Sequence, residues 1–228
     1  MASKPESIAK LIDHTLLKAE TDREGIERLC GEAVAEGFCS VCVNPFWVKM
    51  VADLLKEETV KVCTVIGFPL GADNPRVKAY QAGSAMEQGA RELDMVVNIG
   101  AVKSGYYRTV EEEIREVRKA AEDNIIKVII ETCFLNREEK VRLCEIVREC
   151  GADFVKTSTG FGSAGASLDD VRLLRETVGP NVGVKASGGI RDLETLIGMV
   201  KAGANRIGTS SGVRIMEEYR QKNKEEEL

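Results

Sequence analysis

Two lysines in short apolar segments are the residues of this sequence best suited to chemistry. Lys156 lies in the segment FVKTS and Lys185 lies in the segment VGVKA. An ordinary lysine is almost entirely protonated near pH 7, and an ammonium group is a poor nucleophile. Burial and a second cation nearby both lower the pKa of a lysine, so that its neutral amine can form an imine with a carbonyl compound. We therefore expect imine-forming catalysis, in preference to two lysines that reach solvent or pair with carboxylates.

Ionisable residues in two further apolar segments, ELDMVVN and KVIIET, can support this chemistry. Successive side chains on a strand point to opposite faces, so Asp94 lies opposite its apolar neighbours, and Lys127 shares a face with Glu131. Asp94 can orient a lysine or a water and pass protons while an imine forms. The alternative for Asp94 is a structural salt bridge with Lys185. We expect the ionisable side chains of these segments to share one interior site.

Glycine-rich turns indicate that the site also binds phosphate. Two of them are the segments Ser187-Gly188-Gly189 and Gly208-Thr209-Ser210-Ser211-Gly212. Glycine lets backbone amides approach an anion, and the dipole of the helix that follows favours negative charge. A third segment, GFGSAG (160–165), matches the dinucleotide pattern G-x-G-x-x-G. Its late place in the chain and its distance from the next helix favour a mobile active-site loop instead.

The segments that must position these residues alternate between short apolar runs and amphipathic helices. The predicted strands are residues 11–14, 38–43, 61–66, 92–97, 126–131, 153–157, 182–186 and 205–208. Capping boxes indicate three of the helix starts, at Thr21 with Glu24, Thr109 with Glu112 and Asn136 with Glu139. Eight such repeats predict a single (β/α)8 barrel over residues 1–228, with a charged, frayed tail over 221–228. Active sites of such barrels lie at the C-terminal ends of the strands.

Composition narrows the class of protein. The 228 residues are 43% hydrophobic and 30% charged, as in a soluble globular domain. The net charge of −5 argues against a nucleic-acid or anionic-membrane partner, and MASKPESIAK lacks a signal-peptide core, so we expect a cytoplasmic protein. A single histidine, His14, disfavours the usual zinc sites, and we expect no metal and no cofactor. The pair Cys39 and Cys42 matches C-x-x-C, but its strand-like setting favours packing over redox chemistry.

These residues resemble the 2-deoxyribose-5-phosphate aldolase family, whose members form a lysine imine without a metal. The likeness runs from LIDHTLL (11–17) to RIGTSSG (206–212). Its most specific pieces are ELDMVVNIGA (92–101), KVIIET (127–132), DFVKTSTGFG (153–162) and GVKASGGIR (183–191).

The resemblance implies a role for each matching residue. Lys156 forms the Schiff base, Lys185 is the cationic neighbour that assists it, and Asp94 completes the proton relay. The implied phosphate contacts are Gly160, Gly188, Gly189, Gly208, Ser210 and Ser211. Supporting positions are expected at Thr15, Lys127 and Glu131.

The resemblance also implies a reaction, the reversible cleavage of 2-deoxy-D-ribose 5-phosphate into D-glyceraldehyde 3-phosphate and acetaldehyde. A homodimer or homotetramer is expected with it. Two departures stand out: Phe161 replaces a lysine that some relatives carry, and the chain ends in EEEL, with its last tyrosine at Tyr219. The alternatives are another imine-forming barrel aldolase or transaldolase and, in a different class, a non-catalytic phosphosugar-binding barrel.

Overall fold

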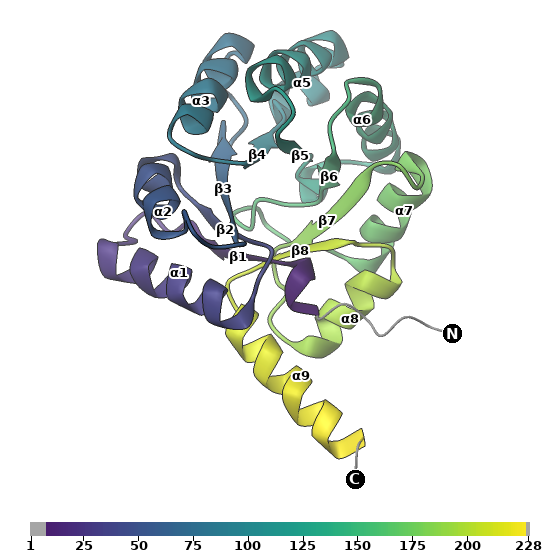
Figure 1. The fold of residues 1–228 in the computed structure, drawn as a ribbon. Coiled ribbons are helices and arrows are strands. Elements are labelled where there is room, and N and C mark those ends of the chain that lie inside the picture. The colour runs from purple at the N-terminus through teal and green to yellow at the C-terminus, as the bar shows by residue number, and fades with distance from the viewer. Residues whose placement is uncertain (1–7, 227–228) are drawn as a thin grey trace.

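The protein is a closed barrel of eight parallel strands surrounded by helices (Figure 1). The computed structural model describes residues 8–226, and its strands follow one another around the barrel in chain order. The strands are β1 (Ile12–Leu16), β2 (Ser40–Val43), β3 (Lys61–Ile66), β4 (Glu92–Val96), β5 (Ile125–Ile129), β6 (Phe154–Lys156), β7 (Gly183–Ser187) and β8 (Arg206–Thr209). Each overlaps one of the predicted segments, and the predicted (β/α)8 fold is confirmed.

Helices follow the strands and form the outer ring in Figure 1. They are α1 (Arg23–Glu36), α2 (Val48–Leu54), α3 (Pro75–Glu87), α4 (Ile99–Lys103), α5 (Tyr107–Ala121), α6 (Arg137–Glu149), α7 (Leu168–Val178), α8 (Leu193–Lys201) and α9 (Gly212–Glu226). Short 3-10 turns occur at Ile8–Leu11, Pro45–Trp47 and Thr132–Phe134. No helix in the described part of the chain is both long and apolar enough to cross a membrane.

The helix starts test the capping predictions. The capping box of Asn136 with Glu139 is confirmed at the start of α6. The one at Thr21 is wrong by one residue, because the side chain of Asp22 accepts the Gly25 N–H at 2.9 Å. The one at Thr109 is wrong, since α5 has already begun at Tyr107. The tail expected to fray from residue 221 is helical as far as Glu226, and residues 227–228 lie outside the described residues.

The strands separate an apolar outer layer from a charged interior. Leu93 and Met95 of β4 belong to the main hydrophobic core between strands and helices. Asp94, between them, is fully buried with Lys127 and Lys185 inside the barrel. The predicted alternation along β4 is therefore confirmed. Because unpaired buried charges are very costly, such an interior is stable only if its charges are paired.

A buried ion pair outside the barrel holds the segment that follows β4 in place. Lys78 Nζ on α3 lies 2.5 Å from Glu113 Oε2 on α5 and donates to the Val96 carbonyl at 2.8 Å. Glu113 Oε1 accepts the Asn98 N–H at 2.7 Å. Burial lowers the pKa of Lys78 and raises the pKa of Glu113, although their attraction opposes both shifts. The pair ties two helices to the end of the strand that carries Asp94.

Replacing Lys78 with methionine should lower the free energy of unfolding by about 3–5 kcal/mol, because Glu113 is left as a buried charge without its cation. Urea denaturation followed by circular dichroism measures the loss. Lys49→Met is the control, since the Lys49–Asp53 pair is exposed and should contribute at most about 0.5 kcal/mol. A loss below about 1 kcal/mol for Lys78→Met would show that this pair does not hold the helices.

Candidate active site

The three residues predicted to do chemistry meet inside the barrel. Lys156 on β6 and Lys185 on β7 are partners in the register of the two strands. The Nζ atoms of both lie 2.6 Å from the same oxygen, Oδ2 of Asp94. Asp94 and Lys185 are fully buried, whereas Lys156 lines the cavity at the mouth of the barrel. Lys156 is therefore the member of this group that a substrate can reach.

A second set of charged side chains lies deeper, near the N-terminal ends of the strands. Arg206 Nη1, at the start of β8, lies 2.8 Å from Asp13 and 3.0 Å from Glu92. Glu92 lies 2.6 Å from Lys127, and Asp13 lies 2.5 Å from Lys185. Asp13, Glu92, Lys127 and Arg206 thus form a continuous network of ion pairs beneath Lys156, Lys185 and Asp94, which we call the floor network.

Sequence reasoning predicted Lys127 but missed Asp13, Glu92 and Arg206. The signal was available for Glu92, because it lies two residues before Asp94 and must share its face. Asp13 and Arg206 lie in predicted strands of only four residues, 11–14 and 205–208, which are too short to show an alternation that assigns a face.

The electrostatic surroundings fix the charge of two members of the site. Burial by itself would raise the pKa of Asp94, but Lys127, Lys156 and Lys185 hold that pKa well below its usual range. Burial likewise disfavours the charged form of Lys185, but Asp13 and Asp94 outweigh it and hold the pKa above its usual range. Asp94 is accordingly a permanent carboxylate at neutral pH and Lys185 a permanent cation. The Asp94 carboxylate is placed to orient the amine of Lys156, 2.6 Å away, and its expected part in a proton relay stays a prediction.

The cavity at the C-terminal ends of the strands has a volume of about 400 Å³, a size that suits a small molecule. Its lining includes the predicted residues Thr15, Lys156, Gly160, Gly188, Gly189, Gly208 and Ser210. Ser211 is not part of the lining, and its N–H already donates to Thr209 Oγ1 at 2.9 Å. Lys18 and Arg191, which sequence reasoning did not select, add two cationic side chains to the lining. The cavity thus combines a reachable amine with glycine turns and positive charge.

Glu131 supports the loop between β6 and α7. Its carboxylate accepts the Thr159 N–H at 3.2 Å and the Thr159 hydroxyl. Glu131 has a φ of 53°, a left-handed conformation that is uncommon for a residue with a side chain. Phe161 follows in this loop, lines the cavity and packs edge-on against Phe68 with ring centres 5.3 Å apart. The segment 160–165 does not open directly into a helix, since α7 begins only at Leu168, so the dinucleotide reading is not supported.

Cysteines also face the barrel interior. Cys42 and Cys63 are register partners on β2 and β3, and both thiols are free. Their sulfurs and an oxygen of Asp94 lie within 4.8 Å of one another, a spacing that could hold a metal ion. However, Asp94 contacts three ammonium groups, which a metal ion would have to displace. Cys39 and Cys42 do not form a disulfide.

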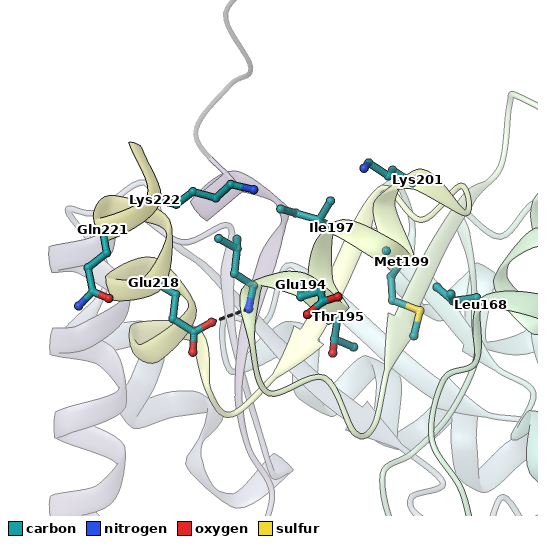
Figure 2. Close-up of a pocket in the computed structure, with 11 residues that line it drawn as sticks. Leu168, Glu194, Thr195, Ile197, Met199, Lys201, Glu218, Gln221 and Lys222 are labelled. Atoms are coloured by element: carbon teal, nitrogen blue, oxygen red, sulfur yellow. Dashed lines mark hydrogen bonds between the residues drawn. The ribbon is translucent and has the colours of Figure 1, made fainter. Parts of the chain in front are cut away.

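A larger hollow, of about 950 Å³, lies on the outside of the barrel between α8 and α9 (Figure 2). Ile197 and Lys201 of α8 and Lys222 of α9 line it, and Glu218 Oε2 accepts the Leu193 N–H at 2.8 Å between the two helices. None of the lysines, carboxylates or glycine turns described above contributes to its lining. The chemistry therefore belongs to the mouth of the barrel.

Comparison with known proteins agrees with this arrangement. The model of the DeoC/LacD family aldolases matches residues 7–218. The deoxyribose-phosphate aldolase of Geobacillus sp. (strain WCH70) is 58% identical over 212 residues, which cover 92% of this chain and 95% of that protein. Among solved structures, QR15, an aldolase, aligns with a TM-score of 0.91 at 46% identity, covering 95% of this chain and 97% of that one. The tetrameric deoxyribose phosphate aldolase from Aeropyrum pernix aligns with a TM-score of 0.85 at 36% identity, over 93% and 91% of the two chains. The chain is an aldolase, and hence a lyase, that belongs to the DeoC/LacD family.

Proposed function

We propose that this aldolase cleaves 2-deoxy-D-ribose 5-phosphate reversibly into D-glyceraldehyde 3-phosphate and acetaldehyde, through an imine on Lys156. The substrate is supported by its relatives, which are deoxyribose-phosphate aldolases. The observation that carries the mechanism is the position of Lys156, which shares one carboxylate oxygen with Lys185 and lines the cavity. The permanent cation beside it disfavours a second ammonium group in the same buried place.

The proposed reaction begins when the amine of Lys156 attacks the substrate aldehyde to form a carbinolamine. Loss of water yields a protonated imine, which acts as an electron sink for the carbon–carbon bond. The bond between C2 and C3 breaks, its electron pair moves to the imine, and the C3 hydroxyl loses its proton to solvent, so that glyceraldehyde 3-phosphate is released and an enamine remains on Lys156. Protonation of the enamine carbon and hydrolysis of the resulting imine free acetaldehyde and restore the amine. Throughout, Asp94 and Lys185 hold the nitrogen in place and balance its charge.

The phosphate group would bind at the opposite side of the cavity, among the glycine turns. Gly188 and Gly189 have φ angles of 85° and 80°, left-handed conformations that only glycine adopts readily, and both line the cavity. Ser210 stands before the first turn of α9, whose dipole favours an anion. The side chains of Lys18 and Arg191 can supply the positive charge that Phe161 lacks. Binding the phosphate there fixes the aldehyde carbon over Lys156.

We further propose that the enzyme acts as a homo-oligomer in the cytoplasm. The oligomer is supported by the tetrameric structure of the relative from Aeropyrum pernix. A reducing compartment is supported by the seven cysteines, all of them free.

Borohydride reduction in the presence of acetaldehyde should add a stable ethyl group at Lys156, because reduction traps the imine. Peptide mass spectrometry locates the modified residue. Chelators should leave activity unchanged, since no step of the proposed reaction uses a metal. Labelling confined to Lys185, or activity abolished by chelation, would contradict the mechanism. Use of dihydroxyacetone phosphate in place of acetaldehyde as the donor would point to a different aldolase.

Replacing Lys185 with methionine should lower kcat by at least ~10³, because the second cation at Oδ2 of Asp94, which disfavours an ammonium group beside it, is then missing. The pH–rate profile should move to higher pH by about one unit or more. Steady-state kinetics from pH 6 to 10 measures both effects, and circular dichroism checks that the variant is folded. Near-normal activity at pH 7 would show that Lys185 does not control the nucleophile.

Replacing Gly189 with valine should lower kcat/KM for 2-deoxyribose 5-phosphate by roughly 10², the scale of a few charge-assisted hydrogen bonds. Kinetics with unphosphorylated 2-deoxyribose should change little, because that sugar makes no phosphate contact. Gly151→Val is the matched control: Gly151 has a φ of 73° and open space around a Cβ, as Gly189 has, but does not line the cavity. Equal losses on both sugars would mean that the Gly189 substitution damages the barrel and not the phosphate site.

A further inference from the structure

We propose that Arg206 and Glu92 are positioning residues that set the charge of the barrel interior, so that Lys156 is the lysine that gives up its proton. This inference rests on the proposed imine chemistry. It concerns two residues of the floor network that do not line the cavity and cannot touch the substrate.

The first observation is a charge count. Inside the barrel, the described chain places the cations Lys127, Lys156, Lys185 and Arg206 among the carboxylates Asp13, Glu92 and Asp94. With every group ionised, this cluster has one positive charge in excess. The loss of a single proton leaves it neutral, which is the state that a buried, poorly solvated place favours. The charge balance of the cluster therefore favours one neutral amine.

The second observation is that the carboxylates are shared unequally among the lysines. Lys127 lies within 3.7 Å of all three carboxylates. Lys185 lies 2.5 and 2.6 Å from two of them. Lys156 contacts only Asp94 among the described carboxylates, through the oxygen that Lys185 also uses. Coulomb attraction falls with distance. Of the three lysines, Lys156 therefore gives up the least attraction to carboxylates when it becomes neutral.

Arg206 supplies the excess charge permanently, since a guanidinium group does not lose its proton in a protein. Its position is fixed by Asp13 and Glu92 and by the ring of Phe154, whose centre lies 5.3 Å from the guanidinium carbon. Without Arg206, the three lysines and three carboxylates would balance when all are ionised. Deprotonation of Lys156 would then create a buried net negative charge.

Glu92 acts in the opposite direction. Its carboxylate lies 3.0 Å from Arg206 and 2.6 Å from Lys127, so it offsets part of the positive charge at the floor of the barrel. If Glu92 were replaced by a neutral residue, the cluster would have two positive charges in excess. Proton release from Lys156 would then become easier. Arg206 and Glu92 thus shift the release of the proton from Lys156 in opposite directions.

Other titratable groups lie around the cluster. Lys18 and Arg191 line the cavity with Lys156 but are exposed, so solvent screens their charges, and the buried Glu131 is bonded to Thr159.

Thiols lie closer, since Cys63 Sγ is 3.2 Å from Asp94 and 3.3 Å from Lys127. Burial raises the pKa of Cys63 on β3 well above its usual range, so Cys63 is neutral near pH 7. A hydrogen bond from Cys63 lowers the pKa of Cys42 on β2, and Cys42 is therefore tested separately below. Cys39, at the end of the chain before β2, faces Arg206, and burial raises the pKa of its thiol.

The test is the rate of imine trapping at Lys156 by acetaldehyde and cyanoborohydride, measured by mass spectrometry between pH 5 and 10. A unit charge roughly 10 Å away, at an effective dielectric constant of about 20, changes a proton equilibrium by about one pH unit. Arg206→Met should therefore move the pH profile of trapping up by about one unit, and Glu92→Gln should move it down by a similar amount. The double variant removes one charge of each sign and should restore the profile of the original protein.

Two further variants separate charge from structure. Arg206→Lys keeps the cation and should move the profile by less than half of the Arg206→Met shift, even if it melts at a lower temperature. If Arg206 and Glu92 have a purely structural role, trapping should be slower in both single variants, without opposite shifts of the pH profile. The double variant should then not restore the original profile. That result would overturn the proposal, as would a shift in Cys42→Ala as large as that in Arg206→Met.

The same experiment distinguishes this inference from the proposed function. If the unsubstituted protein is not trapped at Lys156 at any pH, the imine mechanism itself fails. If it is trapped with a clear pH dependence and the Arg206 and Glu92 variants leave that dependence in place, only the role of the floor network fails.

Discussion

One carboxylate oxygen organises the centre of this protein. Oδ2 of Asp94 lies 2.6 Å from two lysine nitrogens. The two lysines belong to β6 and β7, neither of which pairs with β4, the strand of Asp94. The contact is possible only because the sheet closes and brings β4, β6 and β7 around a common interior. Burying these charges is costly, and the cost is offset only while each ion keeps its partners. The closed barrel and the ionised cluster therefore depend on each other.

The candidate site combines regular strands around the lysines with irregular turns at the mouth of the cavity. The lysines lie within regular strands, whose register fixes them against their neighbours. The glycine turns lie beyond the strand ends, where backbone conformations of positive φ at Gly160, Gly188 and Gly189 leave amides and space at the mouth. A positioned amine requires the first kind of structure, and an anion held by backbone amides requires the second.

Strand alternation made much of this site predictable from sequence. A period of two residues is insensitive to small errors in strand boundaries, so the inward positions of Asp94, Lys127 and Lys185 followed from their apolar neighbours alone. The pairings did not follow, because they depend on which strands become neighbours across the closed barrel. Arg206 illustrates the limit: it begins its strand and reads as a solvated end residue, yet it is 8% exposed between two carboxylates. The wrong helix start at Thr109 has a similar cause, since packing of α5 extends that helix past its local capping signal.

The proposed role of the floor network would make one interior both stable and reactive. A cluster with equal numbers of cations and carboxylates would be more favourable to bury, but each lysine in it would be held firmly as an ion. One additional guanidinium destabilises the fully ionised cluster and leaves the least paired lysine to relieve the excess. That lysine is Lys156, which is also the one that lines the cavity. In this proposal, reactivity is a property of the charge balance of the whole interior, and the strand order decides which lysine carries it.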